Sequence, residues 1–459
     1  MAEQEARAHR RTRVLVLGGG IAGMAAAHRL AGQGLEVVLL EASDQLGGLG
    51  TFVQSGRDDV ERFYHCVMPT DESLLALLEG IGVRETIEWR RTTMGIVVEG
   101  RHFPFNTALD LLRFSPLSLM QRVRLGVVSL MLHRLGRGKD LDHVRTEDWL
   151  RGLYGDQIWE KVWEPLFRSK FGAAVGDVPA LYLWQRLGRE KNVAVRGYPR
   201  GGYKALIDAL RASIVAHGGV VRTSAPVDRL HADAQHATVR LVSGEVLSAD
   251  WVVSTLPIPL LRVIAADDAD LSALLPTLDL PYQGVVNALF FLRRPLEGHY
   301  WTPVLSSGTD FDGVVEMSSL TGPQRYSGRH LAYTMKYTDR SSALYAEDET
   351  SIADRWTDQL LALYADLPLT RADVLEVQVH KAPFVEPSYP LGYAEAKPDI
   401  AVGDSRLLLD TTAQIYPRVT AWNSSAGLSD QVVAHLVRRM ADTSTREADA
   451  GEHDARTAR

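Results

Sequence analysis

The sequence predicts an α/β fold built on βαβ units, and three observations lead to this prediction. The segment "RVLVLGGGIAGMAAAHRLAGQGLEVVLLEAS" contains a strand pattern, a glycine turn, a helix pattern and a second strand pattern. A glycine-opened helix followed by a strand occurs again in "YPRGGYKALIDALRASIVAHGGVVRT". The stretch "LLLDTTAQIYPRVTAWNSSAGLSDQVVAHLVRRM" adds a last strand and helix. We therefore expect a discontinuous α/β domain with other domains inserted between its parts.

Composition limits the class of protein. The chain has 459 residues, 46% hydrophobic and 23% charged, which is enough apolar material for the cores of two or three domains. The single Cys66 excludes an internal disulfide framework and a cysteine-built zinc site, and we predict no metal site. A net charge of −7 without a basic stripe argues against nucleic acid as a partner. The charged N-terminus lacks a signal-peptide core, so we expect a cytoplasmic location.

A dinucleotide-binding motif follows the first strand. Gly18, Gly20 and Gly23 form G-x-G-x-x-G at the start of a helix. The first glycine permits a tight turn, the second lets the backbone approach a pyrophosphate, and the third lets helix and strand pack closely. The first helical turn, with Ile21 and Ala22, would then offer free N–H groups to the phosphates.

Two further features follow the second strand. Glu41, with Ala42 after it, ends that strand about twenty residues later, where a carboxylate accepts hydrogen bonds from ribose hydroxyls and disfavours a 2′-phosphate. Gly47 and Gly48 allow a second close backbone approach that a ligand longer than NAD could use. The pattern therefore favours FAD as the cofactor.

The motifs divide the chain into four parts. We expect a discontinuous FAD-binding domain at 12–70, 195–258 and 398–440, and a helical cap at 71–194. Residues 259–397 alternate strand candidates with polar turns and one helix, which predicts a sheet-based substrate domain. The polar segment 441–459 is expected to be a disordered tail.

These residues resemble the glutathione-reductase-type flavoproteins of the amine oxidase, protoporphyrinogen oxidase and phytoene desaturase kind. The resemblance also includes "VDRL" at 227–230 and "WVVSTLP" at 251–257, and it covers most of the chain in order. It implies a Rossmann FAD-binding domain, a mixed-sheet substrate domain and a helical cap. It further implies that the backbone of Val227 contacts the adenine and that Ser254 and Thr255 pass along the cofactor.

A closer resemblance is to bacterial protoporphyrinogen-oxidase-like oxidoreductases related to UDP-galactopyranose mutase. The matching pieces are "ERFYHCVMPTDESLLALLEGIGV", "GRHFPFNTALDLLRFSPLS" and "VWEPLFRSKFG". In the mutases a histidine of the first piece lies near the flavin, so the resemblance implies a catalytic role for His65 and a substrate-facing position for Tyr64. A core histidine bonded to backbone is the competing interpretation.

The last strand, turn and helix are implied to meet the flavin. Asp410 fits the strand end and Asn423 the helix start, where N–H groups stabilise negative charge on the ring. Tyr416 and Trp422 are then candidate walls of an aromatic pocket, with Tyr416 a candidate for catalysis and Trp422 for substrate binding.

Several Arg and Lys side chains are candidates for catalysis or substrate binding, and each also has a purely structural interpretation. The Arg-Gly usual in related proteins is Thr420 and Ala421 here, so Arg418 is a candidate replacement for the charge and for a catalytic role. Arg168 and Lys170 could hold an anionic substrate under the cap or be ordinary helix-surface cations. Lys336 and Tyr337 could lie on a strand floor of the substrate domain, but we expect them on a solvated sheet face. The segment 111–139 could lie at a membrane interface, but core-facing helices look the same, and we expect no membrane partner.

We expect an FAD-dependent oxidoreductase that takes two electrons, as hydride to flavin N5, from a small metabolite such as a natural-product or sugar-derived intermediate. The alternative is a redox-neutral flavoenzyme of the sugar mutase or isomerase type that uses reduced flavin. The substrate and the oligomeric state stay open.

Overall fold

A computed structural model describes residues 11–172, 177–189 and 194–457, without side-chain detail for 188–189 and 443–457. Its first layer is a parallel sheet in the order β19-β13-β1-β2-β9. Its strands are β1 (Arg13–Leu17), β2 (Glu36–Leu40), β9 (Val220–Arg222), β13 (Trp251–Ser254) and β19 (Leu407–Leu409). Val14, Leu15 and Val16 are wholly buried, as expected for a strand covered on both faces. The predicted βαβ unit and α/β class are confirmed.

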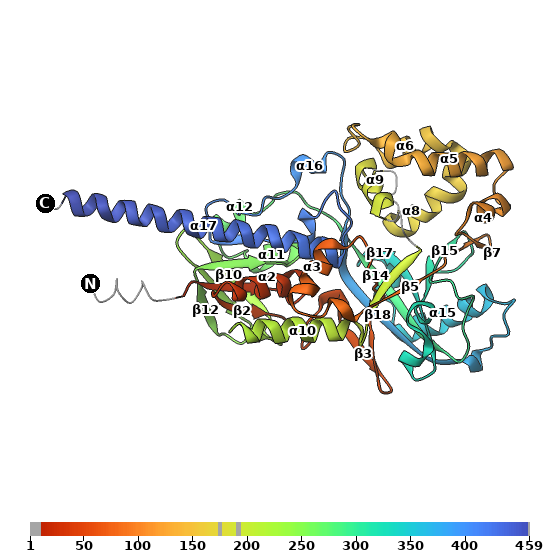
Figure 1. Ribbon diagram of the computed structural model, residues 1–459, viewed down its shortest axis with the longest axis horizontal. Coiled ribbons are helices and arrows are strands. Elements are labelled where there is room, and N and C mark those ends of the chain that lie inside the picture. Colours follow the sequence, from red (N-terminus) through yellow and green to blue (C-terminus); the bar gives the residue numbers. More distant parts are fainter. Residues whose placement is uncertain (1–10, 173–176, 190–193, 458–459) are drawn as a thin grey trace.

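Three helices accompany this sheet. They are α2 (Ile21–Gly32), α10 (Gly202–Ala216) and α17 (Trp422–Thr457), and both α10 and α17 pack against α2 (Figure 1). A three-stranded antiparallel sheet, β10 (Val227–Ala232), β11 (Ala237–Leu241) and β12 (Val246–Ala249), leads into β13. Helix α11 (Ile258–Ile264) contacts β10, so the chain stays beside this domain past the expected boundary at 258. Helix α12 (Ala269–Leu274) follows.

The second domain contains a mixed sheet in the order β18-β14-β17-β16-β15-β6-β7. The strands are β6 (Gly95–Val98), β7 (Arg101–Pro104), β14 (Tyr282–Leu292), β15 (Trp301–Leu305), β16 (Gly313–Glu316), β17 (His330–Thr338) and β18 (Val374–Pro387). β15 and β6 run parallel, and the other neighbours are antiparallel. Helix α15 (Glu349–Leu363) covers β18 with the buried Trp356. Short helices α13 (Met317–Thr321), α14 (Ala343–Ala346) and α16 (Tyr393–Ala396) complete the connections.

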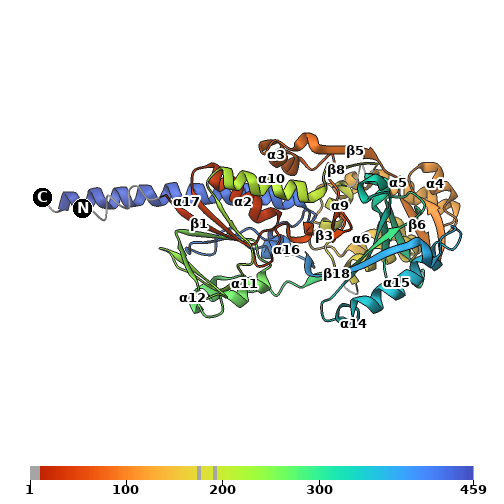
Figure 2. The ribbon, with the colours of Figure 1, turned by 90° about the horizontal axis from the view of Figure 1, so that it is seen from below.

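A helical cap stands over one end of the mixed sheet (Figures 1 and 2). It consists of α4 (Ala108–Arg113), α5 (Leu119–Gly136), α6 (Thr146–Tyr154), α7 (Asp156–Ile158), α8 (Glu164–Phe171) and α9 (Ala180–Arg189), with a π-helical turn at Trp159–Trp163. Stacking of Trp163 on Phe167 continues the packing into α8.

The expected helical segment 71–194 is more mixed than predicted. Helix α3 (Glu72–Gly80) packs against α17, and β5 (Ile87–Arg91) pairs with β8 (Val195–Pro199). The hairpin β6–β7 extends the mixed sheet, because "GIVVEGRHFP" has two short β-branched or aromatic runs around a glycine turn. A second hairpin, β3 (Phe52–Ser55) and β4 (Asp58–Glu61), precedes it.

The C-terminal segment also differs from the prediction. Residues 441–457, expected to be disordered, continue α17 as a helix to Thr457. The packed part of α17 already provides the helical turns whose formation is costly. Each residue added to the end of that helix then gains one backbone hydrogen bond. Within the described residues, no helix is both long and apolar enough to cross a membrane.

Candidate active site

The glycine turn after β1 has the geometry that its sequence predicts. Gly18 has φ +102°, and a Cβ on Gly23 would lie 1.9 Å from the Gly18 carbonyl oxygen. Gly20 precedes α2, and no side chain of the described residues caps this helix. Its first N–H groups are therefore available as donors to an anionic group.

A second glycine turn lies against the first. The Gly47 N–H donates to the Gly19 carbonyl at 2.8 Å, and a Cβ on Gly48 would lie 3.3 Å from the Gly20 Cα. Positive φ angles of 120° at Gly47 and 58° at Gly48 favour glycine at both positions. The two turns leave no room for side chains between them.

Glu41 lies at the end of β2 and organises this edge. Its carboxylate accepts the N–H of Gly19 at 2.6 Å and that of Ser43 at 2.8 Å. Its carbonyl accepts the N–H of Ala225, two residues before Val227, the half-buried first residue of β10. Ala42 is exposed beside Glu41. The structure thus brings Glu41, Ala42 and the start of β10 together.

On the other side of β1, the residues that follow β13 and β19 lie at the same edge of the sheet. The Thr255 hydroxyl donates to the Leu17 carbonyl at 2.8 Å, and a Cβ on Gly18 would lie 2.4 Å from that hydroxyl. Asp410 follows β19 and is buried. Ser429 donates to its Oδ2 at 2.6 Å, and among the described residues its buried Oδ1 has no hydrogen-bond partner. Burial raises the pKa of Asp410 to about 7.

His65 and Trp422 meet beside the second glycine turn. The His65 ring lies 5.0 Å from that of Tyr203 and 5.9 Å from that of Trp422. Trp422 is so close to Gly50 that a Cβ there would lie 2.4 Å from its ring. His65 Nδ1 lies 2.8 Å from the Phe63 carbonyl oxygen, so Nδ1–H donates and Nε2 is the free acceptor. Burial lowers the pKa of His65, which keeps the imidazole neutral at pH 7.

A polar cluster joins Tyr64 to the cap and to the mixed sheet. The Tyr64 and Tyr337 hydroxyls lie 3.4 Å apart, and the Lys170 ammonium of α8 lies 3.9 Å from the centre of the Tyr337 ring. Lys170 also forms a 2.5 Å ion pair with Glu386 of β18, which accepts a hydrogen bond from Tyr182 of α9. We call Tyr64, Tyr337, Lys170, Glu386 and Tyr182 the interdomain cluster.

The two tyrosine hydroxyls of the interdomain cluster differ in acidity. Burial raises the pKa of Tyr64, and the neighbouring Tyr337 raises it further. Burial would also raise the pKa of Tyr337, but the positive charge of Lys170 and the hydrogen bond with Tyr64 lower it below its ordinary value. Arg186 of α9 lowers the pKa of both hydroxyls. Tyr337 is therefore the more acidic hydroxyl of the pair and the one that ionises first.

Tyr416 has a different environment from His65. It is buried, its hydroxyl donates to Asp142 between α5 and α6 of the cap, and its ring packs against those of Tyr389 and Tyr393 at 4.9 Å and 5.4 Å. Burial raises the pKa of Tyr416. Tyr182 connects this group to the interdomain cluster, because its ring stacks on that of Tyr416 at 6.4 Å.

Three other candidates do not join the interdomain cluster. Arg168 projects into solvent and pairs with Glu164 one turn earlier on α8. Arg418 is exposed, with an Nη atom 4.0 Å from where a Cβ on Gly427 would lie. Asn423 accepts the N–H of Leu74 at 3.0 Å and thereby holds the start of α3.

Sequence reasoning missed part of the interdomain cluster. Tyr337 was expected on a solvated face, yet it is half-buried and contacts Tyr64 and Lys170, while Lys336 next to it pairs with Asp312 at 2.7 Å. The alternation of side chains along β17 separates these two neighbours onto opposite faces. Glu386 and Tyr182 carried no sequence signal, because their partners come from segments more than a hundred residues away.

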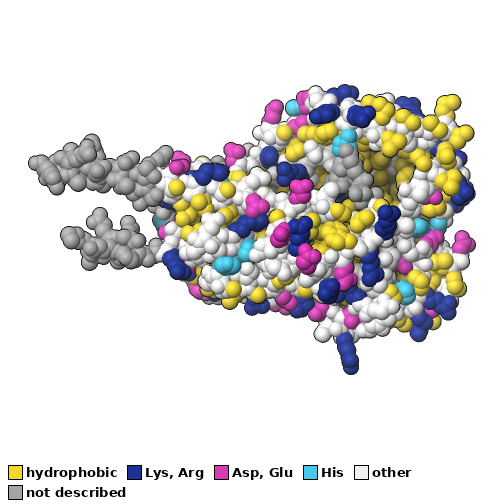
Figure 3. All heavy atoms as spheres, in the orientation of Figure 1, with side chains coloured by type: hydrophobic (Ala, Val, Ile, Leu, Met, Phe, Trp, Pro, Cys, Tyr) yellow, Lys and Arg dark blue, Asp and Glu magenta, His cyan; other side chains and the backbone are white. Residues whose placement is uncertain are grey.

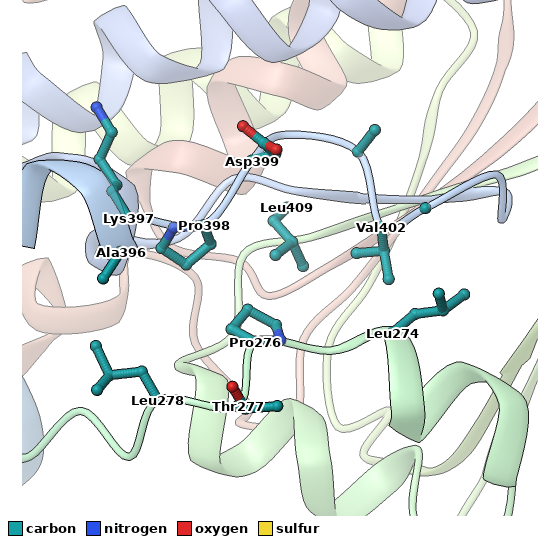
Figure 4. Close-up of a pocket in the computed structure, with 12 residues that line it drawn as sticks. Leu274, Pro276, Thr277, Leu278, Ala396, Lys397, Pro398, Asp399, Val402 and Leu409 are labelled. Atoms are coloured by element: carbon teal, nitrogen blue, oxygen red, sulfur yellow. The ribbon is translucent and has the colours of Figure 1, made fainter.

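A surface pocket of about 420 Å³ lies behind the edge strand β19, away from these polar side chains (Figure 4). Leu274, Pro276, Leu278 and Val402 form its apolar lining, and the charged ends of Lys397 and Asp399 point away from it. It offers no convergent polar groups, so it is a poor candidate for catalysis.

The family follows from comparison with known proteins. The model of the family described as flavin containing amine oxidoreductase matches residues 21–420. The chain belongs to this family. FAD is therefore the cofactor, as the glycine motifs predicted.

Individual relatives are distant. A Mycobacterium tuberculosis protein named as a flavin-containing monoamine oxidase is 26% identical over 264 residues, which are 53% of this chain. That match spans 56% of the relative's length. A crystal structure from Exiguobacterium sp. 255-15, described as a protoporphyrinogen oxidase, has 18% identity and a TM-score of 0.74 over 93% of this chain and 98% of that one. Reduced UDP-galactopyranose mutase has 16% identity and a TM-score of 0.72 over 93% and 94%. Both structures share the fold.

The described residues fit FAD. The sheet edge carries Gly18, Glu41, Thr255 and Asp410 at the carboxyl ends of four parallel strands, where open α/β sheets bind their ligands. The uncapped start of α2 suits the pyrophosphate, and the buried Oδ1 of Asp410 lacks a donor that a cofactor hydroxyl would supply.

Proposed function

We propose that this flavoprotein oxidises a small molecule bound between the flavin and the interdomain cluster. The observation that carries the proposal is the convergence of Tyr64, Tyr337 and Lys170 from three separate segments. Tyr64 precedes His65 in the chain, and the His65 ring lies 5.9 Å from that of Trp422. When bound, FAD supplies a two-electron acceptor for a hydride from the substrate.

The chain's own residues would position that substrate. Lys170 supplies a positive charge held by Glu386, which suits an anionic or strongly polar substituent. Tyr337, whose pKa is lowered by Lys170, would act in its ionised form: the phenolate takes the proton from the substrate N–H or O–H while the hydride goes to the flavin. Neutral His65 would accept a hydrogen bond at Nε2.

The packing of the cap would exclude water. The Tyr182 ring of the cap stacks on that of Tyr416, and Trp163 stacks on Phe167 of α8, the helix that carries Lys170. A dry site strengthens the electrostatic action of Lys170 on a bound anion.

A redox-neutral reaction of the sugar mutase type is the second candidate. The likeness of the fold to UDP-galactopyranose mutase is compatible with it, and the neutral His65 lies in the segment that resembles the mutases. In that case the interdomain cluster would bind an anionic sugar derivative and activity would require reduced flavin.

Anaerobic mixing distinguishes the two candidates. The FAD-loaded protein is mixed with a panel of amines, alcohols and nucleotide sugars while its visible flavin absorbance is followed. Bleaching by one compound without an added reductant supports oxidation. Turnover of a nucleotide sugar only after dithionite reduction supports the mutase type. Failure of the protein to bind FAD at all would overturn both.

A further inference from the structure

Helices α4 and α5 present an apolar surface to solvent. Of the twenty large hydrophobic side chains that are exposed among the described residues, eight lie between 109 and 131. Met120 is 84% exposed and Leu130 is 89% exposed. The full set is Leu109, Leu112, Leu119, Met120, Val123, Val127, Leu130 and Met131, which we call the cap patch.

The spacing of these residues makes one continuous stripe. On α5, Met120, Val123, Val127 and Leu130 recur every three or four residues, so they lie on successive turns of one face. The opposite face of α5 is also apolar, and its Leu125, Leu132 and Gly136 are buried in the cap. Only one of the two apolar faces of α5 is therefore covered by the fold.

The cap patch is held on a well-connected helix pair. Arg122 of α5 donates to the Leu117 carbonyl at 2.7 Å and to the Leu112 carbonyl at the end of α4 at 2.5 Å. Capping boxes begin both helices, at Thr107 and at Ser118. The exposed stripe is thus part of ordered secondary structure rather than of a loose loop.

The charge around the stripe indicates what covers it. Between Asp110 and Asp140, residues 111–139 contain six Arg and Lys and no Asp or Glu, in a chain whose net charge is −7. Arg113, Arg124, Arg134, Arg137 and Lys139 are all exposed. Figure 3 shows hydrophobic side chains with Lys and Arg among them at the end of the molecule where α4 and α5 lie. This local excess of positive charge beside an apolar stripe suits an anionic lipid surface.

We propose that the cap patch docks on the surface of an anionic lipid bilayer, with the apolar stripe of α5 at the level of the headgroups. The stripe enters the interface between lipid headgroups and chains, and the flanking arginines pair with lipid phosphates. No described helix spans a membrane, so the association is peripheral and reversible.

Vesicle flotation of the full, FAD-loaded chain tests this proposal. Vesicles of phosphatidylglycerol and phosphatidylcholine should bind the protein, and vesicles of phosphatidylcholine alone should bind it much less. The double variant Met120→Ser/Leu130→Ser should lower the bound fraction about tenfold or more. A matched control, Val242→Ser/Val263→Ser, removes two apolar side chains that are 66% and 63% exposed elsewhere and should change nothing.

A second pair of variants separates charge from apolar insertion. Arg134→Gln/Arg137→Gln should weaken binding in low salt by about fivefold for each charge removed, and Arg293→Gln/Arg294→Gln, exposed in the substrate domain, should not. The proposal is overturned if the parent does not float with anionic vesicles, or if patch and control variants bind alike. It is also overturned if light scattering shows a lipid-free dimer that Met120→Ser/Leu130→Ser converts to a monomer.

Discussion

The Lys170 ammonium of the cap lies 3.9 Å from the centre of the Tyr337 ring of the mixed sheet and 2.5 Å from a carboxylate oxygen of Glu386. Lys170 and Tyr337 are 167 positions apart in the sequence. The contacts of the Lys170 ammonium with Tyr337 and Glu386 connect the cap to the substrate domain. The ion pair is almost completely buried, so both its strength and the cost of breaking it are larger than at a surface.

Replacing Lys170 with Met should impair both stability and flavin reduction. Glu386 would be left as an unpaired buried carboxylate, which costs about 3 kcal/mol of unfolding free energy. The pKa of Tyr337 should rise towards that of an ordinary buried tyrosine, which a tyrosine absorbance titration measures. With the panel compound that bleaches the parent, the rate of flavin reduction should fall at least tenfold.

Arg168→Met is the matched control on the same helix. Its ion pair with Glu164 is exposed, so its loss should change unfolding free energy by less than about 1 kcal/mol and leave reduction unchanged. The double variant Lys170→Met/Glu386→Gln should regain stability without regaining the rate. A double variant that regains both would show that Lys170 is structural only.

Alanine at Gly20 and at Gly23 should act differently. A Cβ at Gly20 meets nothing closer than 4.0 Å in the protein, so Gly20→Ala should fold normally but lose FAD affinity at least tenfold as the methyl group meets the pyrophosphate. A Cβ at Gly23 would lie 1.9 Å from the Gly18 carbonyl, so Gly23→Ala should lower the melting temperature even without FAD. Fluorescence titration with FAD and thermal unfolding of the apoprotein measure both. Unaltered FAD affinity of Gly20→Ala would contradict this site.

Asp410 should make the stability of the apoprotein fall as pH rises. Its folded pKa of about 7 lies above the unfolded value of 3.8, so its stabilising effect is complete below about pH 4 and is lost as pH rises through 7. The loss is on the order of a few kcal/mol. Asp410→Asn should remove this pH dependence, which denaturant unfolding at pH 5 and pH 8 tests. Equal slopes for parent and variant would contradict the raised pKa.

Tyr416→Phe tests the catalytic role that the sequence suggested for Tyr416. The hydroxyl donates to the buried Asp142, so its removal should cost about 1–3 kcal/mol of unfolding free energy while flavin reduction stays within twofold of the parent. Tyr393→Phe is a suitable comparison, since that buried hydroxyl donates to the Ala413 carbonyl at 2.9 Å. A large loss of reduction rate in Tyr416→Phe, but not in Tyr393→Phe, would instead support catalysis.

The local chemistry of the cofactor site could be predicted from the sequence. Gly18, Gly20, Gly23 and Glu41 lie within one βαβ unit, where spacing along the chain determines spacing in space. Gly47 and Gly48 follow closely enough for the same reasoning, and their positive φ angles agree with it. Short-range patterns of this kind determined the α/β class, the cofactor and the position of the glycine turns.

Tertiary structure alone decided which candidates meet. Arg168 and Lys170 are two positions apart, yet the helix turns Arg168 to solvent and Lys170 to Tyr337, and the sequence could not rank them because both faces of α8 were unassigned. The same holds for α5. Its sequence is apolar on two faces, which is typical of a fully buried helix, but the packing covers only one of them. Contacts between distant segments depend on how the three domains pack, and no local pattern in the chain encodes that packing.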